Sequence, residues 1–135
     1  MRNLELARDY IRRARVRLRT LDVLLEADSW ADVVRESRGV VELTLKALLR
    51  SVGVDPPRVH DVSGVLRSEQ DRLPEALQRS VDELAAASRE LRRDRELAFY
   101  GAEDLTPTEF YDRRDAENAR GLAVRLAFEA ERQER

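Results

Sequence analysis

The sequence contains no cysteine, which excludes disulfide bonds, cysteine zinc ligands and a thiol nucleophile. A single histidine, His60, cannot by itself supply the histidine cluster of a typical zinc site. With 4 prolines and 5 glycines in 135 residues, the chain lacks the many turns of an all-β protein. No uncharged run exceeds the six residues Leu97 to Ala102, and the N-terminus has no apolar run typical of a secretion signal. We therefore predict a cytoplasmic protein that neither spans a membrane nor carries a metal or other cofactor.

An excess of positive charge is also missing, since 25 basic residues stand against 27 acidic ones. A protein that coats nucleic acid would carry a basic excess, whereas the formal net charge here is -2. The basic residues are all arginine except Lys46. Several of them occupy the predicted first helix, namely Arg8, Arg12, Arg13, Arg15, Arg17 and Arg19. This basic face is able to follow a phosphate backbone, although a solvated helix face is the simpler interpretation.

Apolar residues recur at helical spacing along most of the chain, without a strand pattern, a repeat or a linker. The spacing predicts five helices, over residues 3–27, 30–52, 61–73, 74–99 and 112–132. Ser29 stands where the second helix needs an N-cap, and Gly53 is typical of its C-terminal end. We predict an all-α fold, a single-domain up-and-down helical bundle that includes residues 1–135.

The predicted second helix is apolar on more faces than one neighbouring helix can cover. Such a helix lies at the centre of a bundle or at an interface between copies. Because an exposed remainder would exceed what monomers usually tolerate, we predict a homodimer whose interface includes part of the second or fourth helix. The alternative is that the third helix and the loop over 102–111 cover this surface within one chain.

Two residues stand out as candidates for binding or acid–base chemistry. Arg95 continues the apolar stripe of the predicted fourth helix after Leu84, Ser88 and Leu91. A guanidinium placed there needs a carboxylate or an anionic ligand such as phosphate, unless the stripe leaves the core and the side chain reaches water. His60 lies at the start of the predicted third helix. It is a possible general base, although a local hydrogen-bonding role is more common for such a residue.

A polar strip interrupts the apolar second helix. Glu42 precedes Lys46 by four residues, which is the favourable order for an ion pair on a helix. Arg38 and Arg35 lie one and two turns earlier on the same helix. The strip is either the one solvated stripe of this helix or a surface that faces a cleft between protomers.

Segments from all five predicted helices, in their order along the chain, resemble the HEPN domain family (higher eukaryotes and prokaryotes nucleotide-binding). The segments are 7–14, 41–49 with Gly53, 60–62, 95–101, and 107–111 with 115–116. The resemblance covers roughly residues 4 to 130 and implies a helical bundle that commonly dimerises. It also implies a possible partner, because many such domains are encoded beside minimal nucleotidyltransferases in two-component modules, often toxin–antitoxin pairs.

Other members of the family are metal-independent ribonucleases with an arginine followed, four to six residues later, by a histidine. Arg95 matches that arginine, but the residue five positions later is Tyr100, and His60 has no arginine at the required spacing before it. The resemblance thus favours a non-catalytic module that binds a nucleotide or a nucleotidyltransferase partner. In it, Arg95 would contact phosphate and Tyr100 would stack or donate its hydroxyl. Glu42, Lys46 and His60 are further candidates for ligand binding.

Two other functions stay open at this point. One is a metal-independent endoribonuclease that cleaves RNA with Tyr100 in the place of the histidine. A tyrosine with a pKa of ~10 is a poor base at pH 7, although it is able to orient RNA or act as an acid. The other is a purely structural helical protein whose surface masks a nucleotidyltransferase.

Overall fold

The structure, a computed structural model, describes residues 4–56, 63–79, 81–86 and 110–134. All regular secondary structure in these residues is helical, and they contain no strand. The prediction of an all-α helical bundle is therefore confirmed. None of the helices in this part of the chain is long and apolar enough to cross a lipid bilayer.

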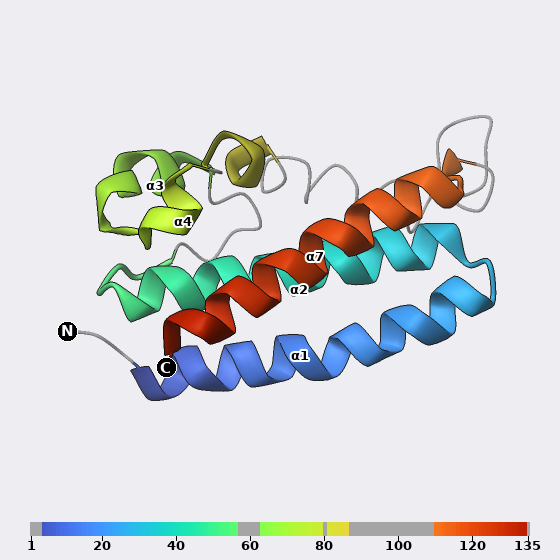
Figure 1. Cartoon of the computed structure of the whole chain (residues 1–135), viewed down its shortest axis with the longest axis horizontal. Helices are drawn as coiled ribbons and strands as arrows, with labels where there is room; N and C mark the ends of the chain where they lie inside the picture. Colours follow the sequence, from blue (N-terminus) through green and yellow to red (C-terminus); the bar gives the residue numbers. More distant parts are fainter. Residues whose placement is uncertain (1–3, 57–62, 80, 87–109, 135) are drawn as a thin grey trace.

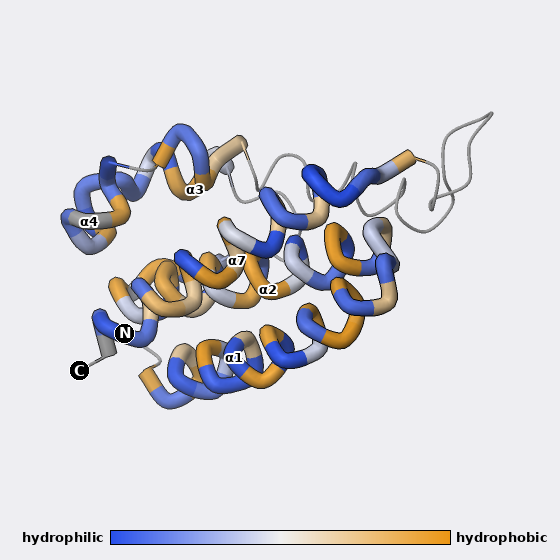
Figure 2. Tube along the Cα trace, turned by 45° about the vertical axis from the view of Figure 1, so that its right-hand side comes forward, coloured by the Kyte–Doolittle hydropathy of each residue, from blue (hydrophilic) through white to orange (hydrophobic). Residues whose placement is uncertain are grey.

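Three long helices form the body of the bundle: α1 (Leu4–Glu26), α2 (Trp30–Ser51) and α7 (Arg113–Glu134). Their ends lie within two residues of the bounds predicted from the sequence. Each of the three packs on the other two. The start of α1 and the end of α7 lie at the same end of the molecule (Figure 1). Hydrophobic and hydrophilic residues alternate along α1, as expected for a helix with one face in the core (Figure 2).

The core is centred on α2, whose apolar side chains are covered by α1 and α7. Eleven residues of α2 are buried, including Leu45, Leu48 and Leu49. The exposed large hydrophobic residues of the described chain lie instead on α1 and α7, and they are Leu4, Val16, Val23 and Phe128. The apolar surface from which we predicted a homodimer is therefore largely buried within one chain. The homodimer itself stays a prediction.

Both α1 and α2 end in the same hydrogen-bonded turn. After α2, Gly53 N–H donates to Arg50 O over 3.1 Å, and Val54 N–H donates to Leu49 O over 2.9 Å. Gly53 has φ 84°, so it occupies the left-handed region that a Schellman turn requires. After α1, Asp28 takes the same place with φ 56°. The turn at Asp28 reverses the chain into α2.

At its start, α2 has Ser29 in the N-cap position, as predicted, but the Ser29 side chain does not cap the helix. Its hydroxyl donates instead to Asp32 Oδ2 over 2.7 Å. The carboxylate one turn into the helix is a stronger acceptor than a hydroxyl. The Ser29 hydroxyl therefore donates its hydrogen bond to Asp32 and not to water.

The single helix predicted over 61–73 is wrong in the described part. The structure has α3 (Ser63–Ser68), a turn at Glu69 and a 3-10 helix, η1 (Gln70–Arg72). A tertiary hydrogen bond explains the break, because Arg72 Nη2 donates to the carbonyl oxygen of Val52 beyond the end of α2. This contact favours the tighter turn of η1 over a continued α-helix.

The single helix predicted over 74–99 is also interrupted. Pro74 is the N-cap of α4 (Glu75–Gln78), which is one turn long and ends in a turn at Arg79. Gln78 Nε2 donates back to Leu73 O over 2.9 Å, so its side chain secures the preceding turn. Residues 81–86 are helical again, and the rest of the predicted helix lies outside the described residues.

The start of α7 is fixed by two reciprocal hydrogen bonds. Asp115 N–H donates to Asp112 Oδ1 over 2.9 Å, and Asp112 N–H donates to Asp115 Oδ2 over 3.0 Å. This is a capping box with aspartate in place of the usual glutamate. The hydrogen bond from Asp115 N–H is the main cause that lowers the pKa of the Asp112 carboxyl from its ordinary value.

Candidate functional site

The structure describes two of the five residues that sequence analysis singled out, Glu42 and Lys46. Lys46 Nζ donates to Glu42 Oε1 over 3.0 Å, so the predicted ion pair is present. Both side chains are only partly accessible, 20% for Lys46 and 15% for Glu42. The polar strip of α2 is therefore half-buried rather than fully solvated. Arg95, Tyr100 and His60 lie outside the described residues, so a site shared with Lys46 stays a prediction.

The six arginines of α1 divide into two groups that face different neighbours. Arg17 faces α2, because its Nε lies 3.1 Å from Glu36 Oε1, whereas the Arg13 guanidinium lies 5.9 Å from the centre of the Tyr10 ring on α1 itself. The other four follow one another at spacings of four, three and four residues, which places them on one stripe of a helix. They are Arg8, Arg12, Arg15 and Arg19. This spacing separates the six arginines, so they do not form the single basic face that the sequence predicts.

A furrow of about 320 Å³ follows this stripe of α1. The arginine furrow, as we call it, is lined by Arg8, Ile11, Arg12, Arg15, Val16, Arg19 and Glu131. Arg15 forms an ion pair with Glu131 of α7, and Arg12 Nη2 lies 2.7 Å from Asp9 Oδ1. No ion pair of Arg8 or Arg19 is found within the described residues. The lining thus carries four guanidinium groups against one carboxylate, an arrangement that attracts anions.

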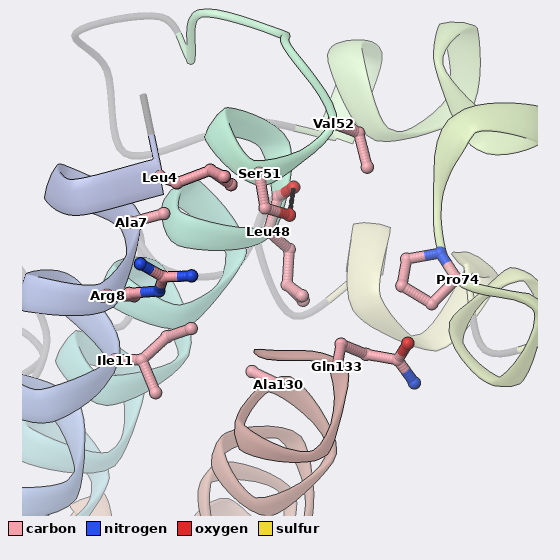
Figure 3. Close-up of a pocket in the computed structure, with 10 residues that line it drawn as sticks. All are labelled: Leu4, Ala7, Arg8, Ile11, Leu48, Ser51, Val52, Pro74, Ala130 and Gln133. Carbon is pink, nitrogen blue, oxygen red and sulfur yellow. Dashed lines mark hydrogen bonds between the residues drawn. The ribbon is translucent and has the colours of Figure 1, made fainter. Parts of the chain in front are cut away.

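A second hollow of about 340 Å³ adjoins the furrow, because Arg8 and Ile11 line both. It lies where α1, the end of α2 and the end of α7 meet Pro74 before α4 (Figure 3). Seven of its ten lining residues are apolar, and they are Leu4, Ala7, Ile11, Leu48, Val52, Pro74 and Ala130. The polar ones are Arg8, Ser51 and Gln133. We call this space the apolar cavity.

Most polar groups of the apolar cavity already have partners. Ser51 Oγ donates to Leu48 O over 2.7 Å, and Gln133 Nε2 donates to Glu129 Oε1 over 3.0 Å. In Figure 3 the Arg8 side chain reaches from α1 toward the space between the helices. Arg8 therefore offers the guanidinium that an anion entering from the furrow would meet first.

The two hollows offer binding groups rather than acid–base pairs. Among the described residues that line the two hollows there is no histidine, and Glu131 is the one carboxylate. Within the described ranges, no group of three or more histidine, cysteine, aspartate or glutamate residues is placed to hold a metal ion. The chemistry that the described surface supports is the recognition of an anion by arginine.

Comparison with protein families gives one match, in which the HEPN domain model fits residues 7–131. This range contains α2 entirely, the four arginines of the furrow and most of α7. No curated protein and no solved structure matched the chain.

Proposed function

The chain belongs to the HEPN domain family, and on this basis we propose that it is a non-catalytic binding module for a nucleotide, held by its phosphate groups on the arginine furrow. Family membership supports a role related to nucleotides or RNA. The furrow adds a surface on which a phosphate group would be recognised. Arg95 and Tyr100, which lie outside the described residues, are the candidates for a further contact with the same class of ligand.

The observation that carries this proposal is the set of four guanidinium groups along one furrow. A guanidinium donates two parallel hydrogen bonds to a phosphate, and such charge-assisted bonds are about twice as strong as neutral ones. Arg15 and Arg12 are held by Glu131 and Asp9, while Arg8 and Arg19 have no ion pair within the described chain. Arg8 and Arg19 lie about 16 Å apart along the axis of α1, so a di- or triphosphate would contact one of the two, together with its neighbours on the stripe, without first displacing a carboxylate.

The absence of a general base from the furrow supports binding over catalysis. RNA cleavage without a metal requires a group that deprotonates the 2′-hydroxyl. The described residues of the furrow lining include no histidine, and their one carboxylate, Glu131, pairs with Arg15. In the segment that carries the family's ribonuclease motif, Tyr100 stands where the histidine is expected.

Isothermal titration with a panel of purine and pyrimidine nucleotides tests the proposal. We expect binding that strengthens from mono- to triphosphate, because each added phosphate reaches another guanidinium. Arg19→Gln should weaken triphosphate binding by about tenfold or more, since a hydrogen bond to a charged group contributes about 1.5–3 kcal/mol.

Arg13→Gln is the matched control, because it removes the same charge from the opposite side of α1. It should leave nucleotide affinity within about twofold, as expected for exposed charges that the ligand does not contact. No heat with any nucleotide would refute direct binding. Equal losses in the two variants would show that the charge of α1 attracts the ligand without a defined site.

A second function, the docking of a protein partner such as a minimal nucleotidyltransferase, is favoured by the outer stripe of α1. Arg12, Val16, Arg19 and Val23 follow spacings of four, three and four residues, and all four are exposed. Val16 is 56% and Val23 is 66% exposed, which is unusual for valine. This spacing is that of a helix seam, so a partner helix with apolar and acidic residues would fit it. A toxin–antitoxin module would be one setting for such a partner.

The same stripe gives the homodimer prediction a definite test. Light scattering of the intact chain would show a species near twice the chain mass of 15.6 kDa if it dimerises. Val16→Glu with Val23→Glu should then return the mass to 15.6 kDa if the dimer uses this stripe. A single species at the chain mass at all concentrations refutes the dimer.

Co-purification of the protein with the product of a neighbouring nucleotidyltransferase gene tests the partner directly.

The ribonuclease alternative has its own experiment. The protein is incubated with structured and single-stranded RNA in the presence of EDTA, and products are resolved on a gel. Cleavage that Arg95→Ala abolishes would establish the enzyme and overturn the non-catalytic proposal. Intact RNA is the result we expect.

A further inference from the structure

We propose that the apolar cavity binds the alkyl chain of a medium-chain fatty carboxylate, with the carboxylate head on Arg8. This inference goes beyond nucleotide binding, because it concerns the hollow on the other side of Arg8 and a ligand without phosphate or base. It rests on the composition of the lining, on the position of Arg8 and on the volume of the cavity.

The lining of the apolar cavity suits an aliphatic chain rather than a nucleobase. Its seven apolar residues are aliphatic or proline, and none of the described residues that line it is aromatic. Proteins usually bind a base by stacking it on an aromatic ring, with hydrogen bonds to the edge of the base. The two candidates for such edge contacts, Ser51 and Gln133, each already donate one hydrogen bond, to Leu48 O and Glu129 Oε1. Methylene groups need no such partners, and they gain from leaving water.

The charge of the cavity requires one anionic head. Among the described residues that line it, Arg8 is the only charged one, and none of them is a carboxylate that would neutralise it. Arg8 also lines the arginine furrow, where the single acid, Glu131, pairs with Arg15. A carboxylate at the mouth would receive two parallel hydrogen bonds from the Arg8 guanidinium while its chain points inward.

The volume sets the length of the chain. A water molecule takes about 30 Å³ of liquid water, and a methylene group has a similar size. The cavity of about 340 Å³ is thus able to hold on the order of ten such groups. We expect carboxylates of about eight to ten carbons to fill it, and longer chains to leave their ends in water.

A chain-length series titrated into the intact protein tests the size of the cavity. Hexanoate, octanoate, decanoate and tetradecanoate are used below the concentrations at which they form micelles. From hexanoate to decanoate, affinity should rise by about fourfold per methylene, the factor expected for burying one CH₂. It should level off by tetradecanoate. No binding of octanoate or decanoate, or a rise that continues unchanged to tetradecanoate, would overturn the proposal.

Two variants then distinguish the contribution of the carboxylate head to affinity from that of the alkyl chain. Arg8→Gln should weaken octanoate by about tenfold and leave 1-octanol, which has no charge, within twofold. Ser51→Phe places a ring at the half-buried rim of the cavity and should weaken both ligands by at least tenfold. Circular dichroism checks the fold of each variant. If Ser51→Phe does not fold, Gln133→Trp, at an exposed rim position on α7, replaces it with the same expected loss.

Matched controls keep this test apart from the nucleotide titration. Arg13→Gln removes one charge from α1 away from the cavity and should leave octanoate affinity unchanged. If Arg13→Gln weakens octanoate as much as Arg8→Gln, the carboxylate follows general charge and the proposal is wrong. Ser51→Phe is outside the furrow lining, so it should not alter nucleotide binding. Each proposal is therefore able to fail without the other.

Discussion

Helices α1 and α2 have almost the same length, 23 and 22 residues, yet α2 buries eleven of its residues and α1 buries four. The difference follows from position, because α2 lies between neighbours and α1 has a whole face in solvent. Apolar residues on α2 therefore stabilise the fold. The arginines on the exposed face of α1 do not take part in core packing, and they form the candidate binding surface.

The exposed position of α1 also explains why the two hollows lie beside it. Only one face of α1 packs on the core. A groove therefore runs along each side of this face, and long side chains of α1 line both grooves. At the α7 edge these side chains include the four arginines of the furrow. At the α2 edge, Arg17 and Glu36 pair across the helices, with the Arg17 side chain 43% exposed. One helix thus presents an open basic edge and a paired edge.

The largest effect should come from shortening a side chain in the α2 core. Leu45 is fully buried, so Leu45→Ala should lower the free energy of unfolding by about 2–5 kcal/mol, through lost burial and the cavity left behind. Val23→Ala on α1 removes a side chain that is 66% exposed, and it should change stability by less than about 0.5 kcal/mol. Denaturant unfolding measures both. Similar losses at the two positions would contradict the assignment of the core to α2.

The next effect concerns the ends of the two helices, which use one turn with different residues. Gly53→Ala should lower the free energy of unfolding by about 1–2 kcal/mol, because its φ of 84° is unfavourable for any residue with a Cβ. Asp28→Gly should raise stability by less than about 1 kcal/mol, because glycine removes the strain of φ 56°. Thermal unfolding of the pair is the measurement. A gain from Gly53→Ala would show that the turn after α2 does not need the left-handed conformation.

Much of the fold was predictable, since long amphipathic helices leave a clear spacing of apolar residues. The ends of α1, α2 and α7 followed from that spacing and from caps such as Gly53. The short helices were not predictable in the same way. Their breaks depend on hydrogen bonds from Arg72 and Gln78 to distant or preceding carbonyl groups. The spacing of apolar residues along the sequence does not reveal such hydrogen bonds.

The candidate site was predicted less well. The pair of Glu42 and Lys46 was visible because it lies within one turn of one helix. The furrow was not visible, although the spacing of Arg8, Arg12 and Arg15 can be read in the sequence. A groove forms only where a second helix lies beside the first, and the sequence does not show that α7 packs there. The apolar cavity joins residues from 4 to 133, which no local pattern links.

A smaller prediction concerns a polar residue on the buried face of α2. Ser37 is fully buried, and its hydroxyl has no hydrogen-bond partner within the described residues. Ser37→Ala should raise the free energy of unfolding by about 1 kcal/mol, because a buried hydroxyl without a partner costs about 1–3 kcal/mol. Thr44 is its control: it is equally buried, but Thr44 Oγ1 donates to Val40 O over 2.8 Å. Thr44→Val should not stabilise the protein. Destabilisation by Ser37→Ala would show that the hydroxyl has a partner.

The smallest effect extends the comparison to α7, whose first turn depends on an ionised carboxylate rather than on burial. The hydrogen bond from Asp115 N–H, the first cause, lowers the pKa of Asp112 in the folded state. A lowered pKa stabilises the fold above the unfolded pKa of about 3.9, and this contribution is lost as the pH falls through the folded value. The Tm of the wild type should therefore exceed that of Asp112→Asn at pH 7, and the difference should shrink as the pH falls below about 3.9. Glu117→Gln, an exposed change one turn further along α7, is the control for general charge. If both variants lose the same difference between pH 7 and pH 3, the effect belongs to net charge and not to the cap.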